Sequence, residues 1–469
     1  MSEASAGMMP AAGAAPEAAP SCSANGPRPA NAPWRAWYAV FVLMVVYIIS
    51  FVDRQVISLF VEPLKRDLLL SDTQISLLQG LSFAIFYTVL GIPIGRIADT
   101  MNRRNLIIVG IGLWSLMTAA CGLARSFPQL FLARMGVGVG EATLSPAAYA
   151  IIADSFPRHQ LSLASSLYTL GAFLGLGLAL ILGGALIELA AGFGEVQLFG
   201  ALLSNWQLVF IMLGGLGIVG ILLMLTIPEP PRTGQVAGEV VSLARTFSYL
   251  RANGRTFTSL FVGFSCFILM SSALAAWSPS VLIRIHGFTA PQAGYSVGMS
   301  ALFASGLGVM LGGHVIDRAI GRGVTDAPLR LGAWCGAGLL LMCLGLAADL
   351  SSTMVLICLA GAYFFLAMPL GAAPAAVQMI APATMRAQLS AFYISAINLI
   401  GLAIGPTAVA LFTDYVFRDE GLVHLSLAAT AAVFLPMAIF LLLWGRPALI
   451  KTDKALQEAI RLQEGGSRP

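Results

Sequence analysis

The sequence predicts an all-α integral membrane protein with twelve spanning helices arranged as two homologous halves. Three observations lead to this prediction: the scarcity of charge, the length of the apolar runs and a set of repeated motifs. Of the 469 residues, 58% are hydrophobic and 10% are charged, whereas a soluble domain carries roughly 25% charged residues. Because such a chain cannot cover itself with a water-compatible surface, we expect it to lie in lipid. The formal net charge of +4 indicates no nucleic-acid partner.

The apolar runs are continuous, as in residues 106–123 and 428–444. About 20 helical residues cross the ~30 Å hydrocarbon core, whereas a membrane β-barrel shows segments of about ten residues that alternate in polarity. The expected spans are residues 36–60, 73–98, 105–124, 128–154, 160–188, 205–227, 256–283, 290–316, 329–348, 352–380, 387–413 and 423–445.

The segments outside these spans define the expected domain organisation. Residues 1–33 are rich in Ala and Pro and lack a basic start followed by an apolar core, so they are expected to form a disordered cytoplasmic tail instead of a signal peptide. Residues 34–228 are expected to form the first six-helix bundle, residues 229–255 a cytoplasmic linker and residues 256–446 the second bundle. Residues 447–469 are then a second cytoplasmic tail.

The basic residues predict the orientation. If the amino terminus is cytoplasmic, nineteen of the 26 Lys and Arg residues lie on the cytoplasmic side and five on the other, with Arg54 and Arg134 inside spans. This bias places both termini in the cytoplasm under the positive-inside rule.

Two sets of motifs recur at constant offsets, which indicates an internal duplication. Gly95-Arg-Ile-Ala-Asp99 matches Gly313-His-Val-Ile-Asp317 at an offset of 218. At an offset of 228, Pro146-Ala-Ala matches Pro374-Ala-Ala, and Arg158-His-Gln-Leu-Ser162 matches Arg386-Ala-Gln-Leu-Ser390.

The first of these motifs resembles the signature loop of the major facilitator superfamily between its second and third helices. The resemblance rests on Gly95, Asp99, Arg103 and Arg104, and on Gly313, Asp317, Arg318, Gly321 and Arg322 in the second half. It departs from the family pattern at Thr100, where Arg or Lys is usual, and at Asn102, where Gly is common. The resemblance implies two pseudo-symmetric six-helix bundles working by alternating access, with charge pairs of this loop linking helix ends in one conformation.

A narrower resemblance, to the spinster branch of this superfamily, rests on Ser50-Phe-Val-Asp53-Arg54, on Arg134 to Glu141, and on Asp154-Ser-Phe-Pro. Members of that branch are proton-coupled or facilitative carriers associated with sphingoid lipids and lysophospholipids. The resemblance therefore implies a small-molecule or lipid substrate, proton coupling and a multi-pass protein of a bacterial inner membrane, expected to be a monomer.

Four ionisable residues stand out away from the ends of the first-half spans: Asp53, Arg54, Arg134 and Glu141. Because a charge near the membrane centre costs about 2.5–3.5 kcal/mol on insertion scales, such residues usually line a cavity and have partners. Arg134 and Glu141 are two helical turns apart and share a face, whereas Asp53 and Arg54 point about 100° apart. We expect Asp53 and Glu141 to exchange a proton and Arg54 to bind an anionic head group or an acid. The alternative is a static ion-pair network that only packs the helices.

The second half has no matching charges, but it offers a set of aromatic and polar residues as a possible cavity wall. These are Trp277, Tyr363, Phe364, Met368, Tyr393 and Asn398. A charged half facing an aromatic half predicts an amphiphilic substrate with an anionic or zwitterionic head.

Two other functions remain open at this stage. The chain could carry a small organic anion or a drug-like compound, or act as a membrane sensor that transports nothing. An enzyme is disfavoured because the four His residues lie at or near predicted loops without ligand spacing. No metal or cofactor is expected.

Overall fold

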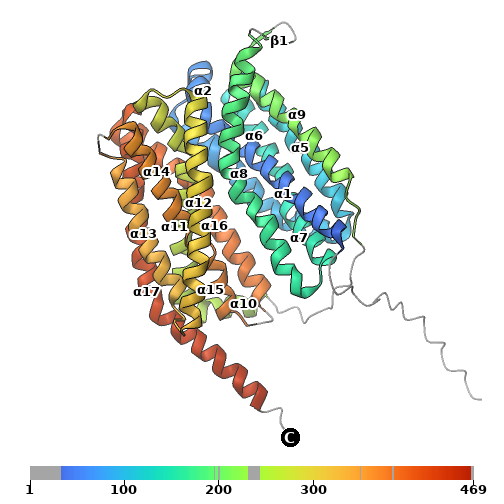
Figure 1. Ribbon diagram of the computed structural model, residues 1–469, viewed down its shortest axis with the longest axis vertical. Coiled ribbons are helices and arrows are strands. Elements are labelled where there is room, and N and C mark those ends of the chain that lie inside the picture. Colours follow the sequence, from blue (N-terminus) through green and yellow to red (C-terminus); the bar gives the residue numbers. More distant parts are fainter. Residues whose placement is uncertain are drawn as a thin grey trace, which may run out of the picture.

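The computed structural model describes residues 33–194, 196–198, 201–230, 243–348, 350–382 and 385–465. It consists of two helical bundles side by side, the first blue to green and the second yellow to red in Figure 1. Each bundle corresponds to one half of the chain. Residues 1–32 of the predicted tail and residues 231–242 of the predicted linker fall outside the described residues.

Short segments interrupt the long helices of the first bundle. Ser71 and Gln74 form a capping box that starts α3, and Ser204 and Gln207 do the same for α9. The elements are α1 (Trp34–Gln55), η1 (Val56–Leu59, a 3₁₀ turn), α2 (Val61–Leu68), α3 (Asp72–Ser76), η2 (Leu77–Leu81, a π-turn), α4 (Ser82–Thr100), α5 (Arg103–Gly122), α6 (Phe127–Glu141), α7 (Leu144–Ser155), α8 (Arg158–Gly192), β1 (Val196–Leu198), β2 (Ala201–Leu203) and α9 (Asn205–Leu225). The two strands pair antiparallel, with Val196 opposite Leu203.

The second bundle repeats this arrangement, with an additional helix before it and a longer one at its end. Its elements are α10 (Leu243–Ala252), α11 (Gly254–His286), α12 (Ala290–Gly321), α13 (Ala327–Gly345), α14 (Ser352–Ala367), α15 (Ala372–Ile380), α16 (Arg386–Leu411), η3 (Phe412–Phe417, a π-turn), η4 (Glu420–Leu422) and α17 (Val423–Gly465). Thr289 caps α12 through a capping box with Gln292.

The predicted spans coincide with the long helices. Eleven helical segments of the described chain are long and apolar enough to cross a bilayer. The remaining predicted span, residues 128–154, is divided between α6 and α7, so the structure is consistent with twelve crossings. The sequence analysis did not predict α2, the β1–β2 hairpin, α10, or the continuation of α17 to Gly465.

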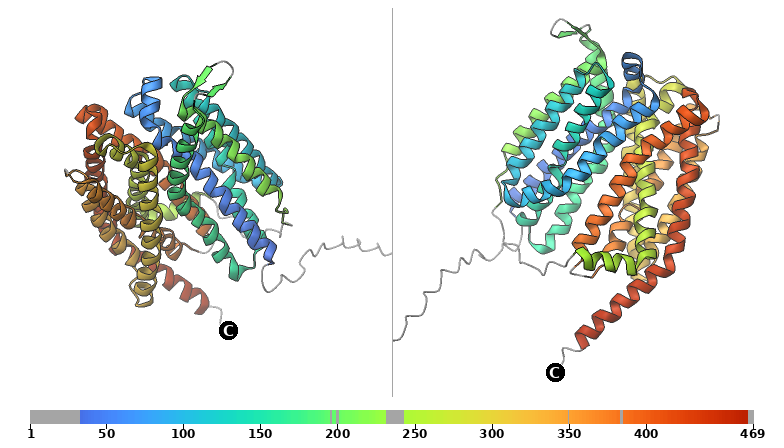
Figure 2. Two further views of the ribbon diagram at one scale, coloured as in Figure 1. Left: turned by 45° about the horizontal axis from the view of Figure 1, so that its top comes forward. Right: turned by 180° about the vertical axis from the view of Figure 1, so that it is seen from behind.

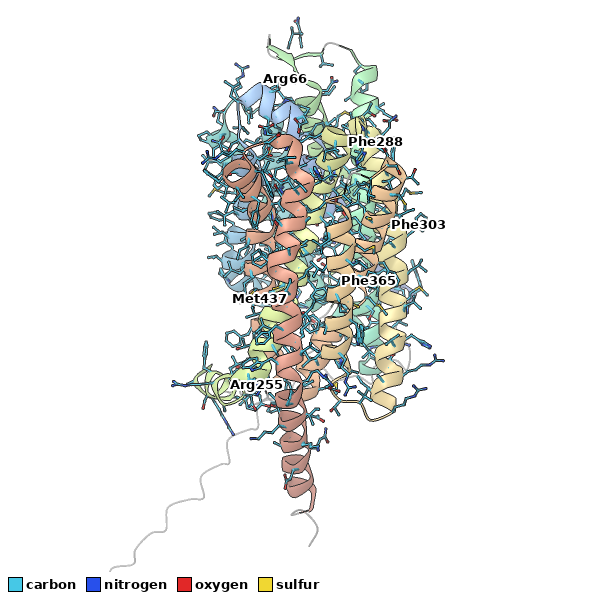
Figure 3. All side chains as sticks on the ribbon, turned by 90° about the vertical axis from the view of Figure 1, so that its left-hand side faces the viewer. Arg66, Arg255, Phe288, Phe303, Phe365 and Met437 are labelled. Atoms are coloured by element: carbon cyan, nitrogen blue, oxygen red, sulfur yellow. The ribbon has the colours of Figure 1, made fainter. Side chains whose placement is uncertain are left out.

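Apolar side chains cover the outside of both bundles. Phe303 is 61% exposed and Trp334 is 77% exposed. In Figure 3, Phe303 and Met437 lie between Arg66 near one end of the molecule and Arg255 near the other. An apolar band between polar ends is the surface expected of a protein in a bilayer.

The bundles approach each other closely where α8 meets α12. A Cβ atom on Gly177 would lie 2.7 Å from the carbonyl oxygen of Gly298, and a Cβ atom on Gly298 would lie 2.7 Å from that of Gly177. Only glycine allows this approach, so these two residues bring the backbones of the two halves into contact.

We call the end with α2 and the hairpin the α2 end, and the opposite end, with α10 and the last turns of α17, the α10 end. The bundles lean apart toward the α10 end (Figure 2). Hydrogen bonds and ion pairs between the two halves lie at the α2 end and in the middle. The structure is therefore closed at its α2 end.

Candidate functional site

An ion pair between Arg54 and Glu141 joins α1 to α6. The Nη2 atom of Arg54 lies 2.5 Å from Oε2 of Glu141, and the two side chains are 12% and 1% exposed. The other carboxylate oxygen of Glu141 has no hydrogen-bond partner in the described structure. This carboxylate can therefore accept another hydrogen bond or a proton.

Arg134 lies two helical turns before Glu141 on the same face of α6. Its side chain is fully buried and contacts backbone atoms. Its guanidinium donates to the carbonyl oxygens of Asp53 at 3.0 Å and of Arg54 at 3.2 Å. These carbonyls stand where α1 changes to the 3₁₀ turn η1, and carbonyls at a helix end lack intrahelical partners. Arg134 thus holds the backbone that carries Asp53 and Arg54.

Asp53 is fully buried, and among the described residues neither of its carboxylate oxygens has a hydrogen-bond partner. Arg54 both pairs with Glu141 and lines a cavity, whereas Asp53 faces the interior of the first bundle. The 100° divergence expected between the two side chains therefore puts only Arg54 at the cavity.

Aromatic rings surround the Arg54 guanidinium, whose carbon lies 4.0 Å from the ring centre of Phe83, 4.8 Å from that of Phe51 and 5.6 Å from that of Tyr87. Cation–π contacts of this kind stabilise a buried cation. A further ring, Tyr47, extends the cluster along α1. The sequence analysis missed these residues, although Phe51 and Tyr47 precede Arg54 by three and seven positions and so share its helical face.

Glycines allow the helices of this cluster to pack closely. A Cβ atom on Gly138 would lie 3.0 Å from the carbonyl oxygen of Phe83, and one on Gly140 would lie 2.7 Å from the backbone nitrogen of Trp114. The glycine run that ends α6 therefore brings Glu141 against α4 and α5. These glycines therefore act in helix packing.

A small central cavity lies next to Arg54, between the two halves. Its volume of about 30 Å³ gives room for about one water molecule. The first half contributes Arg54, Gln55, Ile57, Ser58, Gln79 and Phe83, and the second half contributes Ser272, Ala276, Leu402 and Pro406. We refer to it as the central cavity.

The predicted aromatic wall of the second half lies elsewhere. Trp277 is fully buried and donates to the carbonyl oxygen of Pro406 at 3.0 Å. Tyr363 and Tyr393 are also buried, while Phe364, Met368 and Asn398 are partly exposed. In the structure as described, none of these six residues lines the central cavity, although Ala276, next to Trp277, does.

The residues of the predicted signature loop are brought together only in part. Gly95 and Asp99 lie in α4, but the side chain of Asp99 is outside the described structure. Arg103 forms an ion pair with Asp154, and the backbone nitrogens of Arg103 and Arg104 donate to the Glu229 carboxylate at 3.0 and 2.9 Å. These contacts join α5 to α7 and to the segment after α9.

The second copy of this loop is arranged differently. Asp317 and Arg318 are exposed at the end of α12, and neither forms an ion pair with the residues that the structure describes. Instead Asp326 accepts hydrogen bonds from Arg446 at 2.7 Å and from Arg330 at 2.9 Å. The sequence analysis did not single out Asp326.

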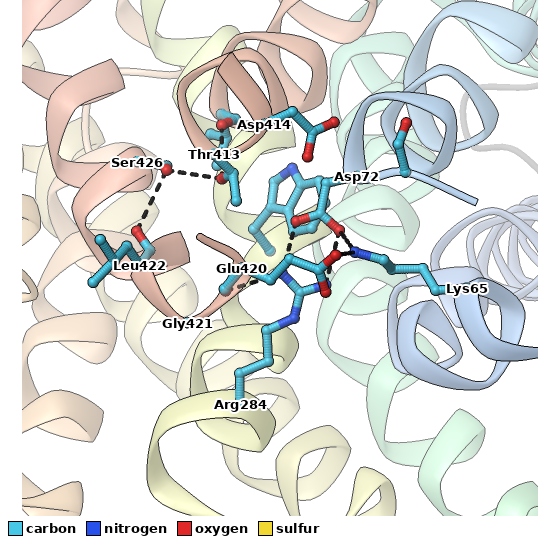
Figure 4. A network of polar contacts seen from close by, with 12 residues as sticks. Lys65, Asp72, Arg284, Thr413, Asp414, Glu420, Gly421, Leu422 and Ser426 are labelled. Atoms are coloured by element: carbon cyan, nitrogen blue, oxygen red, sulfur yellow. Dashed lines mark hydrogen bonds and ion pairs between the residues drawn. The ribbon is translucent and has the colours of Figure 1, made fainter. Parts of the chain in front are cut away.

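A charged network at the α2 end joins the two halves (Figure 4). Arg284 of α11 donates to Asp72 of α3 at 2.7 and 2.9 Å and to Glu62 of α2 at 2.5 Å. Lys65 of α2 lies 2.5 Å from Asp72 and 2.6 Å from Glu420 of the second half. The sequence analysis counted Lys65 and Arg284 only as charges outside the membrane.

Comparison with known proteins identifies the family. Residues 43–406 match the model of the Major Facilitator Superfamily. The chain belongs to the major facilitator superfamily. Within it, an MFS-type efflux pump of Mycolicibacterium smegmatis is 30% identical over 83% of this chain and 87% of its own length. The family and fold are those of a transporter and not of an enzyme.

The resemblance to spinster is also confirmed. Protein spinster of Drosophila melanogaster is 28% identical over 65% of this chain and 49% of its own length. Protein spinster homolog 1 of Homo sapiens is 30% identical over 54% of this chain and 47% of its own length. The chain thus spans about half the length of these spinster relatives.

Solved structures of the superfamily share the fold. A bacterial homologue of the human lysosomal transporter spinster, crystallised in an inward-facing and unoccupied conformation, superposes with a TM-score of 0.77 at 26% identity over 89% of this chain and 98% of that chain. A D-xylose–proton symporter superposes with a TM-score of 0.66 at 15% identity over 86% of this chain and 97% of that chain, which shows the fold alone.

Proposed function

We propose that this chain is a proton-coupled secondary transporter that works by alternating access and moves an amphiphilic or anionic organic substrate, such as a lysolipid or a sphingoid-type lipid. One observation carries the proposal. A buried arginine, Arg54, is held between an acid and aromatic rings at a cavity lined by both halves. Buried ionisable groups at such a place mark substrate and proton pathways in transporters.

The coupling step exchanges one partner of Arg54 for another. A phosphate or carboxylate of the substrate competes with Glu141 for the guanidinium, since arginine binds such groups through two parallel hydrogen bonds. Once released, the Glu141 carboxylate takes up a proton, because an unpaired carboxylate is costly to keep in an apolar interior. Substrate binding and proton uptake are thereby linked at one residue.

Asp53 serves as a second proton site. Because both of its carboxylate oxygens are buried without hydrogen-bond partners in the described structure, the neutral acid is the form that this environment favours. Arg134 holds the neighbouring backbone and so positions Asp53 directly and Glu141 through its ion pair with Arg54. The remaining predicted gating residues are Gly95, Asp99, Asp317 and Arg318. The three charged ones are proposed to form ion pairs in another conformation.

The aromatic cluster explains the proposed preference for an amphiphile. The rings of Phe51, Phe83 and Tyr87 offer apolar surface directly beside the cationic group. A molecule with an anionic or zwitterionic head and an apolar body contacts both at once. The resemblance of the first-half motifs to the spinster branch, which implies sphingoid lipids and lysophospholipids, is a second ground for this substrate class.

The orientation completes the proposal. We take the α10 end as cytoplasmic, in a bacterial inner membrane, because most Lys and Arg residues are predicted to lie on that side. The halves are then residues 34–228 and 256–446, joined by the linker of residues 229–255, and the protein works as a monomer. Closure at the α2 end makes the described conformation the one that faces the cytoplasm.

The similarity to an efflux pump favours a second candidate, a proton-coupled carrier of small drug-like compounds or organic anions. The same Arg54–Glu141 exchange would serve this function. The two candidates differ in the substrate body, since a small compound needs no long apolar surface.

The test is flux in proteoliposomes under an imposed pH gradient. We compare the native chain with Glu141→Gln and Asp53→Asn, using lysophosphatidylcholine and a small anionic drug as competing substrates. Both variants are expected to fold but to lose gradient-driven uptake of the lysolipid. Unchanged uptake by both variants would make these acids structural, and uptake of the drug alone would favour the second candidate.

A further inference from the structure

A large apolar groove lies between the halves toward the α2 end, on the outer surface of the helices. Its volume is about 590 Å³, which falls within the roughly 300–1,000 Å³ range of small-molecule sites. The groove is lined by Leu81 of η2, Ala403 and Thr407 of α16, Tyr415 and Val416 of η3 and Val433 of α17, among other residues. We call it the apolar groove.

The groove opens toward the surrounding lipid. Tyr415, Val416 and Val433 are 65%, 63% and 53% exposed. In a membrane protein such side chains face hydrocarbon, so the occupant of the groove comes from the bilayer. Both π-turns of the described chain, η2 and η3, border the groove, and π-turns are frequent at functional sites.

The apolar groove shares a wall with the central cavity. On α16, Leu402 and Pro406 face the central cavity, whereas the next residues, Ala403 and Thr407, face the groove. The wall is thin at Gly80, where an added Cβ atom would lie 2.6 Å from the carbonyl oxygen of Leu402. The contact between η2 and α16 therefore forms a wall between the lipid-facing groove and the cavity that contains Arg54.

A cation stands just beyond one end of the groove. Arg418 follows the groove residue Val416 by two positions and ends η3 in a left-handed conformation with φ 55°. Its side chain is exposed and makes no hydrogen bond or ion pair with any residue that the structure describes. An arginine at the edge of an apolar channel matches a phosphate at the end of an acyl chain.

We propose that the apolar groove binds the acyl chain of a monoacyl glycerophospholipid from the adjacent leaflet, with the phosphate at Arg418. The site lies one helix contact away from Arg54 and thus serves as the place from which the lipid enters or leaves the central cavity. That second role rests on the transport function proposed above.

The test is photo-crosslinking to the full chain in nanodiscs. The probe is lysophosphatidylcholine with a diazirine on its acyl chain, and labelled peptides are identified by mass spectrometry. In the native chain, labelling is expected on residues 403–416, reduced by excess unlabelled lysophosphatidylcholine but not by the same excess of diacyl phosphatidylcholine.

Two variants fill the groove: Val433→Trp and, in case the first fails to fold, Val416→Trp. The matched control is Val219→Trp on α9, where the valine is 47% exposed and does not line the groove. Filling the groove is expected to lower labelling about ten-fold, equivalent to about 1.4 kcal/mol, while the control leaves it unchanged. Arg418→Gln is expected to weaken competition by the lysolipid, whereas Arg125→Gln, an exposed arginine at the same end, is not.

Labelling that survives in both filled variants, or that diacyl lipid competes equally, would overturn the proposal, since either result describes ordinary boundary lipid. The readout needs no pH gradient and no flux, so it separates the two proposals. If labelling behaves as expected while lysolipid flux is absent, the binding site stands and the transport function fails. If flux is present without groove labelling, the transport function stands and the groove site is wrong.

Discussion

Arg134 donates a hydrogen bond to the backbone carbonyl oxygen of Asp53 at 3.0 Å and leaves the carboxylate of that residue without a partner. The arginine that shares a buried region with two acids is therefore bound to main-chain oxygens. The ion pair of the cluster is made by Arg54, which is 87 positions away from Glu141. Of these two arginines, Arg134 holds the backbone of α1, and Arg54 is placed to exchange its partner Glu141 for another anion.

This division predicts different effects for the two arginines. Replacing Arg134 with Gln leaves at least one buried carbonyl unsatisfied, which costs roughly 1–3 kcal/mol for each group. We expect Arg134→Gln to lower the thermal unfolding temperature of the detergent-solubilised protein, with Arg125→Gln as the exposed control. An unchanged unfolding temperature together with lost flux would assign Arg134 to coupling instead.

The network at the α2 end predicts a conformational effect. Asp72 is fully buried and accepts from Lys65 and Arg284, so Asp72→Asn removes the carboxylate that joins two cations from different halves. We expect the α2 end to open, with a population shift of about ten-fold, or about 1.4 kcal/mol. Spin labels at Leu69 and Arg418, in a background without native cysteines, measure the distance across this end.

The matched control for this measurement is Asp67→Asn. Asp67 also lies at the α2 end, but it accepts hydrogen bonds from Trp206 and Ser204 of its own half. This change is expected to leave the label distance as it is in the native chain. If both variants give the same distance distribution, the network does not hold the end closed.

The contact between Gly177 and Gly298 predicts a second way to open the α2 end. A methyl group on Gly298 would lie 2.7 Å from the Gly177 carbonyl oxygen and 2.8 Å from Ile181, so Gly298→Ala forces α8 and α12 apart. Gly306 of the same helix has open space at its Cβ position, which makes Gly306→Ala the control for helix propensity. The same label pair is expected to report opening only in Gly298→Ala; equal behaviour of the two variants would contradict the prediction.

Asp326 predicts a pH dependence of stability. Burial raises the pKa of this carboxyl, but hydrogen bonds from Arg330 and Arg446 outweigh burial and hold the pKa below its ordinary value. Because the unfolded state then binds the proton more readily, the contribution of Asp326 is fully present above the unfolded pKa of about 3.9. It is lost as the pH falls through the lower folded-state pKa.

The measurement compares unfolding temperatures of the native chain and Asp326→Asn between about pH 6 and pH 3. The native chain is expected to unfold at a higher temperature than Asp326→Asn. This difference in unfolding temperature is expected to be constant in the upper part of the pH range and to shrink toward its lower end. Asp317→Asn, which removes an exposed carboxylate without an ion pair in the described structure, is the control and should leave the unfolding temperature unchanged. A constant advantage of the native chain down to the lowest pH would show that the Asp326 contacts do not stabilise the fold.

The sequence predicted the spans well because hydrophobicity adds up along each local segment. It also singled out Asp53, Arg54, Arg134 and Glu141, since charges within apolar runs are conspicuous. It missed Lys65, Asp72 and Arg284, because charges near span ends are common and only the pairing of two distant halves makes a network of them. It also looked for aromatic residues of the central cavity in the second half, whereas the ring that lines this cavity is Phe83 of the first half, because the direction of a ring depends on helix packing.

By itself the sequence determined that this chain lies in the membrane, that it contains two related halves and that Asp53, Arg54, Arg134 and Glu141 lie within apolar runs. These follow from composition, from apolar length and from motif spacing, all of which act locally. The tertiary structure decided which partner each charge has. A 3₁₀ turn after Gln55 and the break between α6 and α7 set the directions of Arg54 and Glu141, and the packing of two bundles brings Asp72 to Arg284. Such pairings depend on helix bends and contacts between distant segments, for which no local pattern exists.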